Sequence, residues 1–186
     1  MSYELQTEVS FADTGNIDAF GRLRVSQVTT QYDAKQIYDN LPLFVDEELI
    51  GTATSVHSTT LAKTTLTAPA NGDAAILQTK QRFNYQSGKS NLIFMTFKNL
   101  GEGESVSVVT SRSGTETKRD VRDDWDDRLD GTGASGITHD FDNNTIFAID
   151  YEWLGVGRVR YYIIKNGALI NFHSVDFTDT TDVYMS

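Results

Sequence analysis

The sequence predicts an all-β fold, and three observations lead to this prediction. Only two prolines and 14 glycines occur among 186 residues, and Thr, Ser, Val, Ile, Tyr and Phe dominate the ordered-looking stretches. Most of these are strand-forming residue types. Turn segments such as PANGD, YQSGKS, LGEGE and DGTGASG separate the stretches at short intervals, and the only helical pattern is a short one at residues 41–49. We therefore expect an antiparallel β-sandwich of jelly-roll type with an extended N-terminal arm.

The expected strands follow one another along the chain between these turn signals. They cover residues 23–30, 59–67, 74–85, 91–99, 105–111, 145–152, 158–165 and 168–174. No internal repeat and no long low-complexity linker interrupts them. We therefore expect an arm of residues 1–17 followed by a single β-sandwich domain of residues 18–186.

The clearest local signal is a hairpin around Asn166-Gly167, in RVRYYIIK-NG-ALINFHS. Asn-Gly favours a two-residue type I′ turn, which needs positive φ at both positions. The turn sets a register in which Ile163 faces Ile170. Continued without interruption, this register places Tyr161 opposite Phe172 and Arg160 opposite His173. It sorts the apolar side chains onto one face of the hairpin and the polar ones onto the other.

The strand at 145–152 extends this pattern if WLGVG forms a five-residue turn. Asp150 then lies opposite Arg160, and Glu152 lies opposite Arg158. Exposed pairs of opposite charge stabilise a sheet by roughly a few tenths of a kcal/mol each. We therefore expect a three-strand meander with a structural ladder of these four charges on its polar face.

Asp150 and Glu152 also raise the question of catalysis. Alternate residues on one strand place two carboxylates about 6–7 Å apart, near the separation used by glycoside hydrolases. The pattern is similar to the Glu-x-Asp-x-x-Glu strand of jelly-roll glycoside hydrolases, but Ala148 stands at the position of its leading Glu. The nucleophile of that pattern is missing, so the charge ladder is the preferred interpretation.

An acidic segment at residues 119–133, RDVRDDWDDRLDGTG, is the second candidate site. Oxygen-rich loops suit Ca²⁺, but here Arg128 and Leu129 stand where the EF-hand pattern needs an acid and a glycine. Arginines lie between the acids and can neutralise them locally. We expect a solvated or intersubunit loop, and Ca²⁺ binding is left open. Its candidate interaction residues are Trp125, Asp126 and Asp127, with Trp125 an anchor into the domain or a neighbour.

Other functional classes find little support in the sequence. The formal net charge is −10, whereas a site for nucleic-acid phosphates needs a basic face. Cysteine is absent, no apolar run approaches the roughly 20 residues of a membrane span, and the N-terminus lacks a signal-peptide pattern. The three histidines lack ligand spacing, and no nucleophile elbow or phosphate loop occurs. We expect no nucleic-acid partner, no membrane partner, no cofactor, no metal and no enzyme activity.

Five segments together resemble a family of virion structural proteins of tailed bacteriophages. They are DAFGRLRVS (18–26), YDNLPLFVDEELI (38–50), LTAPANGDAAILQTKQRFNYQSGKSNLIFMTF (66–97), WDDRLDGTGASGIT (125–138) and FAIDYEWLGVGRVR (147–160). The resemblance implies a virion component, assembled in the host cytoplasm, with no catalytic residues; head, tail and fibre positions stay open. It also implies chains that often continue past VYMS, so this chain is either a short member of the family or a part of a longer gene product. Our hypothesis is that another subunit then completes the C-terminal edge strand.

The N-terminal segment is expected to take part in assembly. Residues 1–17 form a polar lead, which we expect to pack on a neighbouring subunit as arms in symmetric assemblies do. In DAFGRLRVS, Leu23 and Val25 should enter the sandwich. At least one of Arg22 and Arg24 should meet a carboxylate of this chain or of an adjacent subunit.

Three functions remain as alternatives. The first is a homo-oligomeric structural protein that also contacts other virion proteins. The second is a carbohydrate-binding adsorption module of the virion, which would stack a host-surface glycan on Trp125, Trp153 and tyrosines. The third is a glycan hydrolase that uses Asp150 and Glu152. Buried aromatic side chains favour the first function, and exposed clustered ones favour the second.

Overall fold

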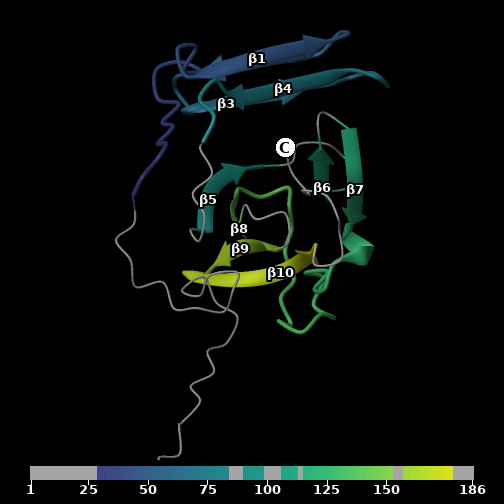
Figure 1. Cartoon of the computed structure of the whole chain (residues 1–186). Helices are drawn as coiled ribbons and strands as arrows, with labels where there is room; N and C mark the ends of the chain where they lie inside the picture. The colour runs from purple at the N-terminus through teal and green to yellow at the C-terminus, as the bar shows by residue number, and fades with distance from the viewer. Residues whose placement is uncertain (1–28, 84–89, 99–105, 113–114, 153–156, 178–186) are drawn as a thin grey trace, which may run out of the picture. The chain divides into compact units, whose positions relative to one another are not determined.

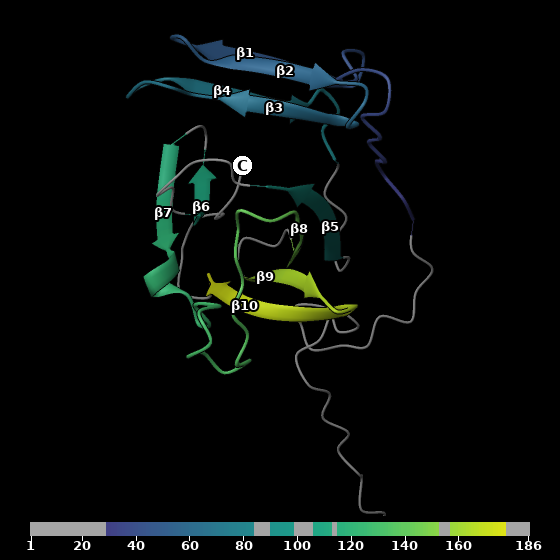
Figure 2. The same cartoon turned by 180° about the vertical axis from the view of Figure 1, so that it is seen from behind.

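The computed structural model describes residues 29–83, 90–98, 106–112, 115–152 and 157–177. Nearly all regular elements in these ranges are strands, and the strand ladders are antiparallel (Figures 1 and 2). The predicted all-β antiparallel fold is confirmed. The arm expected at residues 1–17 lies outside the described residues, as do Arg22, Arg24, Trp153 and most of the strand expected at 23–30.

The described residues form two compact units. One unit lies within Gln27–Tyr85, and the other contains the described residues that follow Gln86. We call them the small unit and the large unit. The single domain predicted over residues 18–186 stays a prediction.

The small unit contains two nested ladders. Strand β1 (Val45–Ile50) pairs with β4 (Ala74–Thr79), and β2 (Thr54–Ser58) pairs with β3 (Lys63–Thr67). Asp73 connects the turns between the ladders: its carboxylate accepts hydrogen bonds from the Thr52 N–H (3.0 Å), the Thr52 hydroxyl (2.6 Å) and the Ala70 N–H (3.0 Å). The small unit is therefore organised by backbone ladders and by polar contacts at its turns.

The helical turn predicted at residues 41–49 is wrong. Leu41 has a positive φ of 59°, and its carbonyl accepts the N–H groups of Phe44 and Val45, each at 2.9 Å. This closes a turn, and β1 starts at Val45. The acidic residues of β1 disfavour a strand in isolation, but β4 pairs with it along its whole length. The strand predicted at 59–67 is limited to β3, and β2 was not predicted.

The large unit contains a four-stranded sheet of order β10-β9-β8-β5 and a separate hairpin. Its strands are β5 (Ser90–Phe97), β6 (Ser107–Arg112), β7 (Thr115–Val121), β8 (Thr145–Glu152), β9 (Arg158–Lys165) and β10 (Ala168–Asp176). Strands β6 and β7 form the hairpin, and the 3₁₀ turn η1 (Arg122–Asp124) follows it. The bounds predicted for β8 and β9 are confirmed, and β7 was not predicted.

The hairpin of β9 and β10 has the predicted turn but not the predicted register throughout. Asn166 and Gly167 have φ values of 54° and 78°, as a type I′ turn requires. The ladder is interrupted between Asn171 and His173, so Phe172 is an extra residue in β10. His173 therefore lies opposite Tyr161, and the predicted pairs Tyr161–Phe172 and Arg160–His173 are wrong.

The core of the large unit lies between one face of the four-stranded sheet and a cover made by β6 and the segment that follows β7. Its buried members are Val108, Trp125, Leu129, Phe141, Phe147, Ile163 and Phe172. Phe147 stacks on Phe97 of β5, with ring centroids 4.0 Å apart. Two packed layers around one apolar core are consistent with the predicted sandwich.

Candidate functional site

The candidate site is the acidic loop, residues 122–130, where it docks on β10. The Asp127 N–H donates to the Phe172 carbonyl (2.9 Å), and the Asp126 carboxylate accepts the Ser174 N–H (2.8 Å). Phe172 is the bulge residue, and β10 is the terminal strand of its sheet. Bulges and terminal strands leave backbone groups without ladder partners. The acidic loop supplies partners for two such groups and thereby covers this edge.

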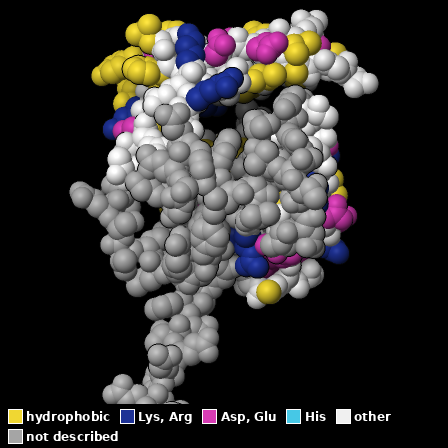
Figure 3. Space-filling view, viewed as in Figure 1, with side chains coloured by type: hydrophobic (Ala, Val, Ile, Leu, Met, Phe, Trp, Pro, Cys, Tyr) yellow, Lys and Arg dark blue, Asp and Glu magenta, His cyan; other side chains and the backbone are white. Residues whose placement is uncertain are grey.

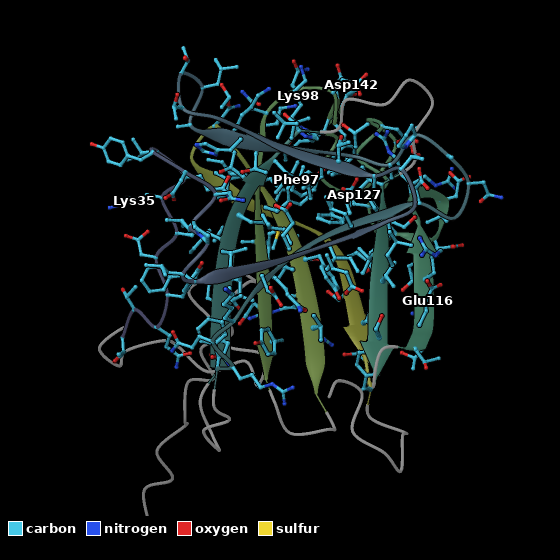
Figure 4. The ribbon with its side chains drawn as sticks, turned by 90° about the horizontal axis from the view of Figure 1, so that it is seen from above. Lys35, Phe97, Lys98, Glu116, Asp127 and Asp142 are labelled. Atoms are coloured by element: carbon cyan, nitrogen blue, oxygen red, sulfur yellow. The ribbon has the colours of Figure 1, made fainter. Side chains whose placement is uncertain are left out.

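Asp127 organises the inside of the loop. Its side chain is 3% exposed, and its two oxygens accept the N–H groups of Leu129 (2.9 Å) and Ser135 (2.7 Å). Burial raises the pKa of Asp127, but hydrogen bonds from the Ser135 hydroxyl and from both N–H groups outweigh burial and lower it below its ordinary value. Gly133 gives the carboxylate its space, because a Cβ there would collide with it. Figure 4 labels Asp127 near the middle of the view, whereas Glu116 and Asp142 lie toward its rim.

Trp125 anchors the acidic loop in the core. It is 5% exposed, its indole N–H donates to the Asp120 carbonyl (3.1 Å), and its ring lies 4.6 Å from that of Phe172. Of the two positions predicted for Trp125, the structure shows the anchor into its own chain. Trp125 therefore offers no surface for stacking a sugar. An assembly role for Trp125, Asp126 and Asp127 stays a prediction.

Arg122 connects the two ends of the acidic loop, a role that was not predicted. Its guanidinium donates to the carbonyls of Arg128 (2.6 Å), Leu129 (2.8 Å) and His139 (3.2 Å) and lies 5.4 Å from the Phe141 ring centroid. The prediction that arginines neutralise neighbouring acids does not describe Arg122. Arg122 instead donates hydrogen bonds to backbone carbonyls, and no sequence pattern predicts which carbonyls an arginine will bind.

A cluster of ionisable side chains joins β7, the acidic loop and β10, with His173 and Asp120 buried at its centre and Lys118 and Asp126 exposed at its rim. His173 is 4% exposed; its Nε2 lies 3.1 Å from Asp120 and its Nδ1 lies 3.5 Å from Asp126. The Lys118 ammonium group lies 2.9 Å from the same oxygen of Asp120. Burial raises the pKa of Asp120, but Lys118 and His173 outweigh it, so this pKa lies below its ordinary value. The predicted register placed His173 opposite Arg160, so this cluster was not predicted.

A carboxylate bonded to histidine is also part of hydrolytic triads, which in addition need a nucleophile bonded to the histidine. In the described part of the chain, His173 hydrogen-bonds to Asp120 and to no hydroxyl or thiol that could act as a nucleophile. Both ring nitrogens face carboxylates, and the ring stacks on Tyr161 with centroids 6.2 Å apart. The observed contacts fasten three segments of the fold to one another.

The predicted charge ladder is found in part, and in a different environment. Asp150 lies opposite Arg160 and forms an ion pair with it, as predicted. The prediction of an exposed polar face is wrong, because both side chains are fully buried. Arg158 binds Asp176 of β10 at 2.8 Å. The side chain of Glu152 lies outside the described residues, so the Glu152–Arg158 pair stays a prediction.

The Asp150–Arg160 pair also bears on the two-carboxylate alternative. A glycoside hydrolase needs both carboxylates to reach the scissile bond. Asp150 is 0% exposed and holds Arg160, so its carboxylate does not face a surface that a glycan can reach. Among the residues described, no group of three or more His, Cys, Asp or Glu side chains is arranged to hold a metal ion.

Comparisons with models of protein families, with curated proteins and with solved structures find no match for this chain. The class of the protein therefore follows from its structure alone. It is an all-β antiparallel protein in which an acidic loop docks on a bulged terminal strand. Within the described ranges, no helix is long and apolar enough to cross a membrane.

Proposed function

We propose that this chain is a structural component of a tailed-bacteriophage virion and acts by homo-oligomeric assembly, with contacts to neighbouring virion proteins. The observation that carries the proposal is the surface of the small unit. Each of its strands exposes at least one large apolar side chain: Leu49 and Ile50 on β1, Val56 on β2, Leu66 on β3 and Ile76 on β4. Figure 3 shows hydrophobic side chains gathered over this unit.

The small unit buries little apolar surface of its own. Among its described residues, the buried hydrophobic side chains are Val45 and Ala53. A domain of about 60 residues is marginal even when it buries about 60% of its unfolded surface. Large exposed apolar patches mark interaction sites. Contacts with other subunits would supply the burial that this unit lacks, at roughly 25 cal/mol per Å² of apolar surface covered.

The sequence resemblance supports the same proposal. The segments DAFGRLRVS and FAIDYEWLGVGRVR, with the three that lie between them, are similar to virion structural proteins of tailed phages. The second of these segments supplies Asp150 and Arg160, which form a buried ion pair. Buried Trp125 likewise favours a structural role over the carbohydrate-binding alternative.

The test is the composition of purified particles. Mass spectrometry of gradient-purified virions from the phage that encodes the chain should detect it at a stoichiometry fixed by particle symmetry. Val56→Glu should reduce incorporation, because Val56 is 60% exposed on the apolar surface of the small unit. Asn71→Glu, at an exposed turn of the same unit, serves as the control and should incorporate normally. A chain that stays in the lysate and is absent from purified particles would overturn the proposal.

A further inference from the structure

The two edges of the four-stranded sheet in the large unit differ in how they are protected. Strand β10 forms one edge, and its bulge is covered by the acidic loop through Asp126 and Asp127. Strand β5 forms the other edge, and no described strand pairs with its outer side (Figure 4). A terminal strand with unpaired backbone groups is a template for pairing with another chain.

The composition of β5 contains none of the usual protection against such pairing. Natural proteins protect edge strands with charged residues, proline, bulges or short strand length. Strand β5 reads SNLIFMTF: it has eight residues, no charge and no proline. Its ladder with β8 is regular from Ser90 to Phe97. Four of its large side chains are exposed: Ile93 (39%), Phe94 (55%), Met95 (41%) and Phe97 (38%).

We propose that two copies of this chain pair through β5, antiparallel to each other, so that their four-stranded sheets join across a two-fold axis. This inference rests on the proposed homo-oligomeric function and names a surface that the assembly uses. The occupant of the β5 edge is therefore the β5 strand of a second copy.

Charge is the first argument for a second copy. At a net charge of −10, two copies repel each other wherever their acidic surfaces meet. Strand β5 carries no charge, so two copies of it meet without opposing like charges. By contrast, β7 (TETKRDV) and β1 (VDEELI) would each place acids of both copies near the contact.

Closure of the assembly is the second argument. If β5 of one copy paired with β10 of the next, the contact would be heterologous and would continue from copy to copy into a ring or an open fibre. The acidic loop occupies that edge of β10, so the β5-to-β10 contact is blocked. Pairing of β5 with β5 is isologous and stops at two copies.

The geometry of the pair gives a sharp expectation. In an antiparallel ladder, directly opposed residues point to the same side of the sheet. The two-fold axis of the pair therefore runs between one residue of β5 and the same residue in the second copy, which lie directly opposite each other. Residues to either side of this position move away from their own copies by about 6.6 Å per step, twice the rise per residue.

The pair should be weak in isolation. The exposed parts of four β5 side chains provide on the order of a few hundred Å² per copy, below the about 800 Å² per partner of a standard stable interface. We expect concentration-dependent dimers of the free chain, with the contact strengthened by other contacts in the closed particle.

The first experiment measures the mass of the full-length chain by sedimentation velocity over a range of concentrations. Phe94→Glu should raise the dimer dissociation constant about tenfold or more, because it places a negative charge of each copy in the contact and removes apolar area. The control is Ile146→Glu. Ile146 is 43% exposed and lies on the same face of the same sheet, but on the interior strand β8. Edge pairing predicts that this control leaves the dimer intact, and circular dichroism verifies folding of both variants.

The second experiment does not depend on a disruptive substitution. The chain contains no cysteine, so single cysteines can be placed at positions 92 to 96 in turn and oxidised. Edge pairing predicts that disulfide cross-linking peaks at one position and falls on both sides of it. A cysteine at Val109, which is 40% exposed on β6, gives the collision background.

The outcomes separate this inference from the proposed function. A dimer that survives Phe94→Glu but is lost with Ile146→Glu would overturn edge pairing in favour of face-to-face contact. Cross-linking that is uniform along β5 would overturn it as well. A chain that is present in particles but monomeric in solution up to about 1 mM would overturn the β5 pair and leave the proposed function standing.

Discussion

Asp150 of β8 and Arg160 of β9 lie opposite each other and form an ion pair from which solvent is excluded, with 0% and 1% of their surfaces exposed. A second ion pair on β9 joins Arg158 to Asp176 of β10 and is exposed. The same strand thus carries a buried and an exposed pair. The two pairs allow the effect of burial on an ion pair to be measured within one fold.

Asp150→Ala should lower the free energy of unfolding by about 3–5 kcal/mol, because it leaves the Arg160 guanidinium buried without its carboxylate. Asp176→Ala is the matched control and should cost about 0–1 kcal/mol, as is typical of exposed pairs. Urea denaturation followed by far-ultraviolet circular dichroism measures both values. Equal losses in the two variants would contradict the distinction between the buried and the exposed pair.

Trp125→Ala should lower the free energy of unfolding by about 3–5 kcal/mol, because a large ring is removed from the core beside Phe172 and Phe141. Trp125→Phe should cost less, about 1 kcal/mol for the lost hydrogen bond to Asp120 together with a small packing change. Denaturant titrations measure both variants. A small loss in Trp125→Ala would show that the acidic loop docks without its anchor.

The sequence was sufficient to predict the strands whose side chains alternate or that end at strong turn signals. Strands β8 and β9 and the Asn166-Gly167 turn are of this kind. The helical turn expected at 41–49 was wrong because the spacing of its apolar residues resembles a helix, while pairing with β4 decides the structure. Strand β7 (TETKRDV) was missed for a related reason, since its charged residues have low strand propensity.

The site could be predicted less well than the fold. The Asp150–Arg160 pair follows from a regular register, which a turn and an alternating pattern can specify. The contacts of His173 depend on one extra residue in β10, Phe172. No pattern in the local sequence indicates this bulge. Arg122 binds carbonyls of residues up to 17 positions away, so its role exists only once the loop has folded.

Gly133→Ala should destabilise the acidic loop, because the new Cβ would collide with the Asp127 carboxylate. We expect a loss of about 1–3 kcal/mol, typical of overpacking. The loss should shrink when Asp127→Ala removes the carboxylate first, which a double-mutant cycle measures. Independent, additive effects of Gly133→Ala and Asp127→Ala would contradict this account.

The Asp127 carboxylate in the acidic loop should make the free energy of unfolding depend on pH in the acidic range. The pKa of Asp127 in the folded chain is lowered: burial raises it, but hydrogen bonds from Ser135 and Leu129 outweigh burial. A lowered folded pKa means that the carboxylate contributes its full stability above the unfolded pKa of about 3.9, and that this contribution is lost as the pH falls through the folded value. Asp127→Asn should therefore cost about 1–3 kcal/mol at pH 7, and the difference from the wild-type chain should shrink below about pH 4. Urea denaturation at a series of pH values measures this difference, and a difference that stays constant down to pH 2.5 would mean that Asp127 acts through packing alone.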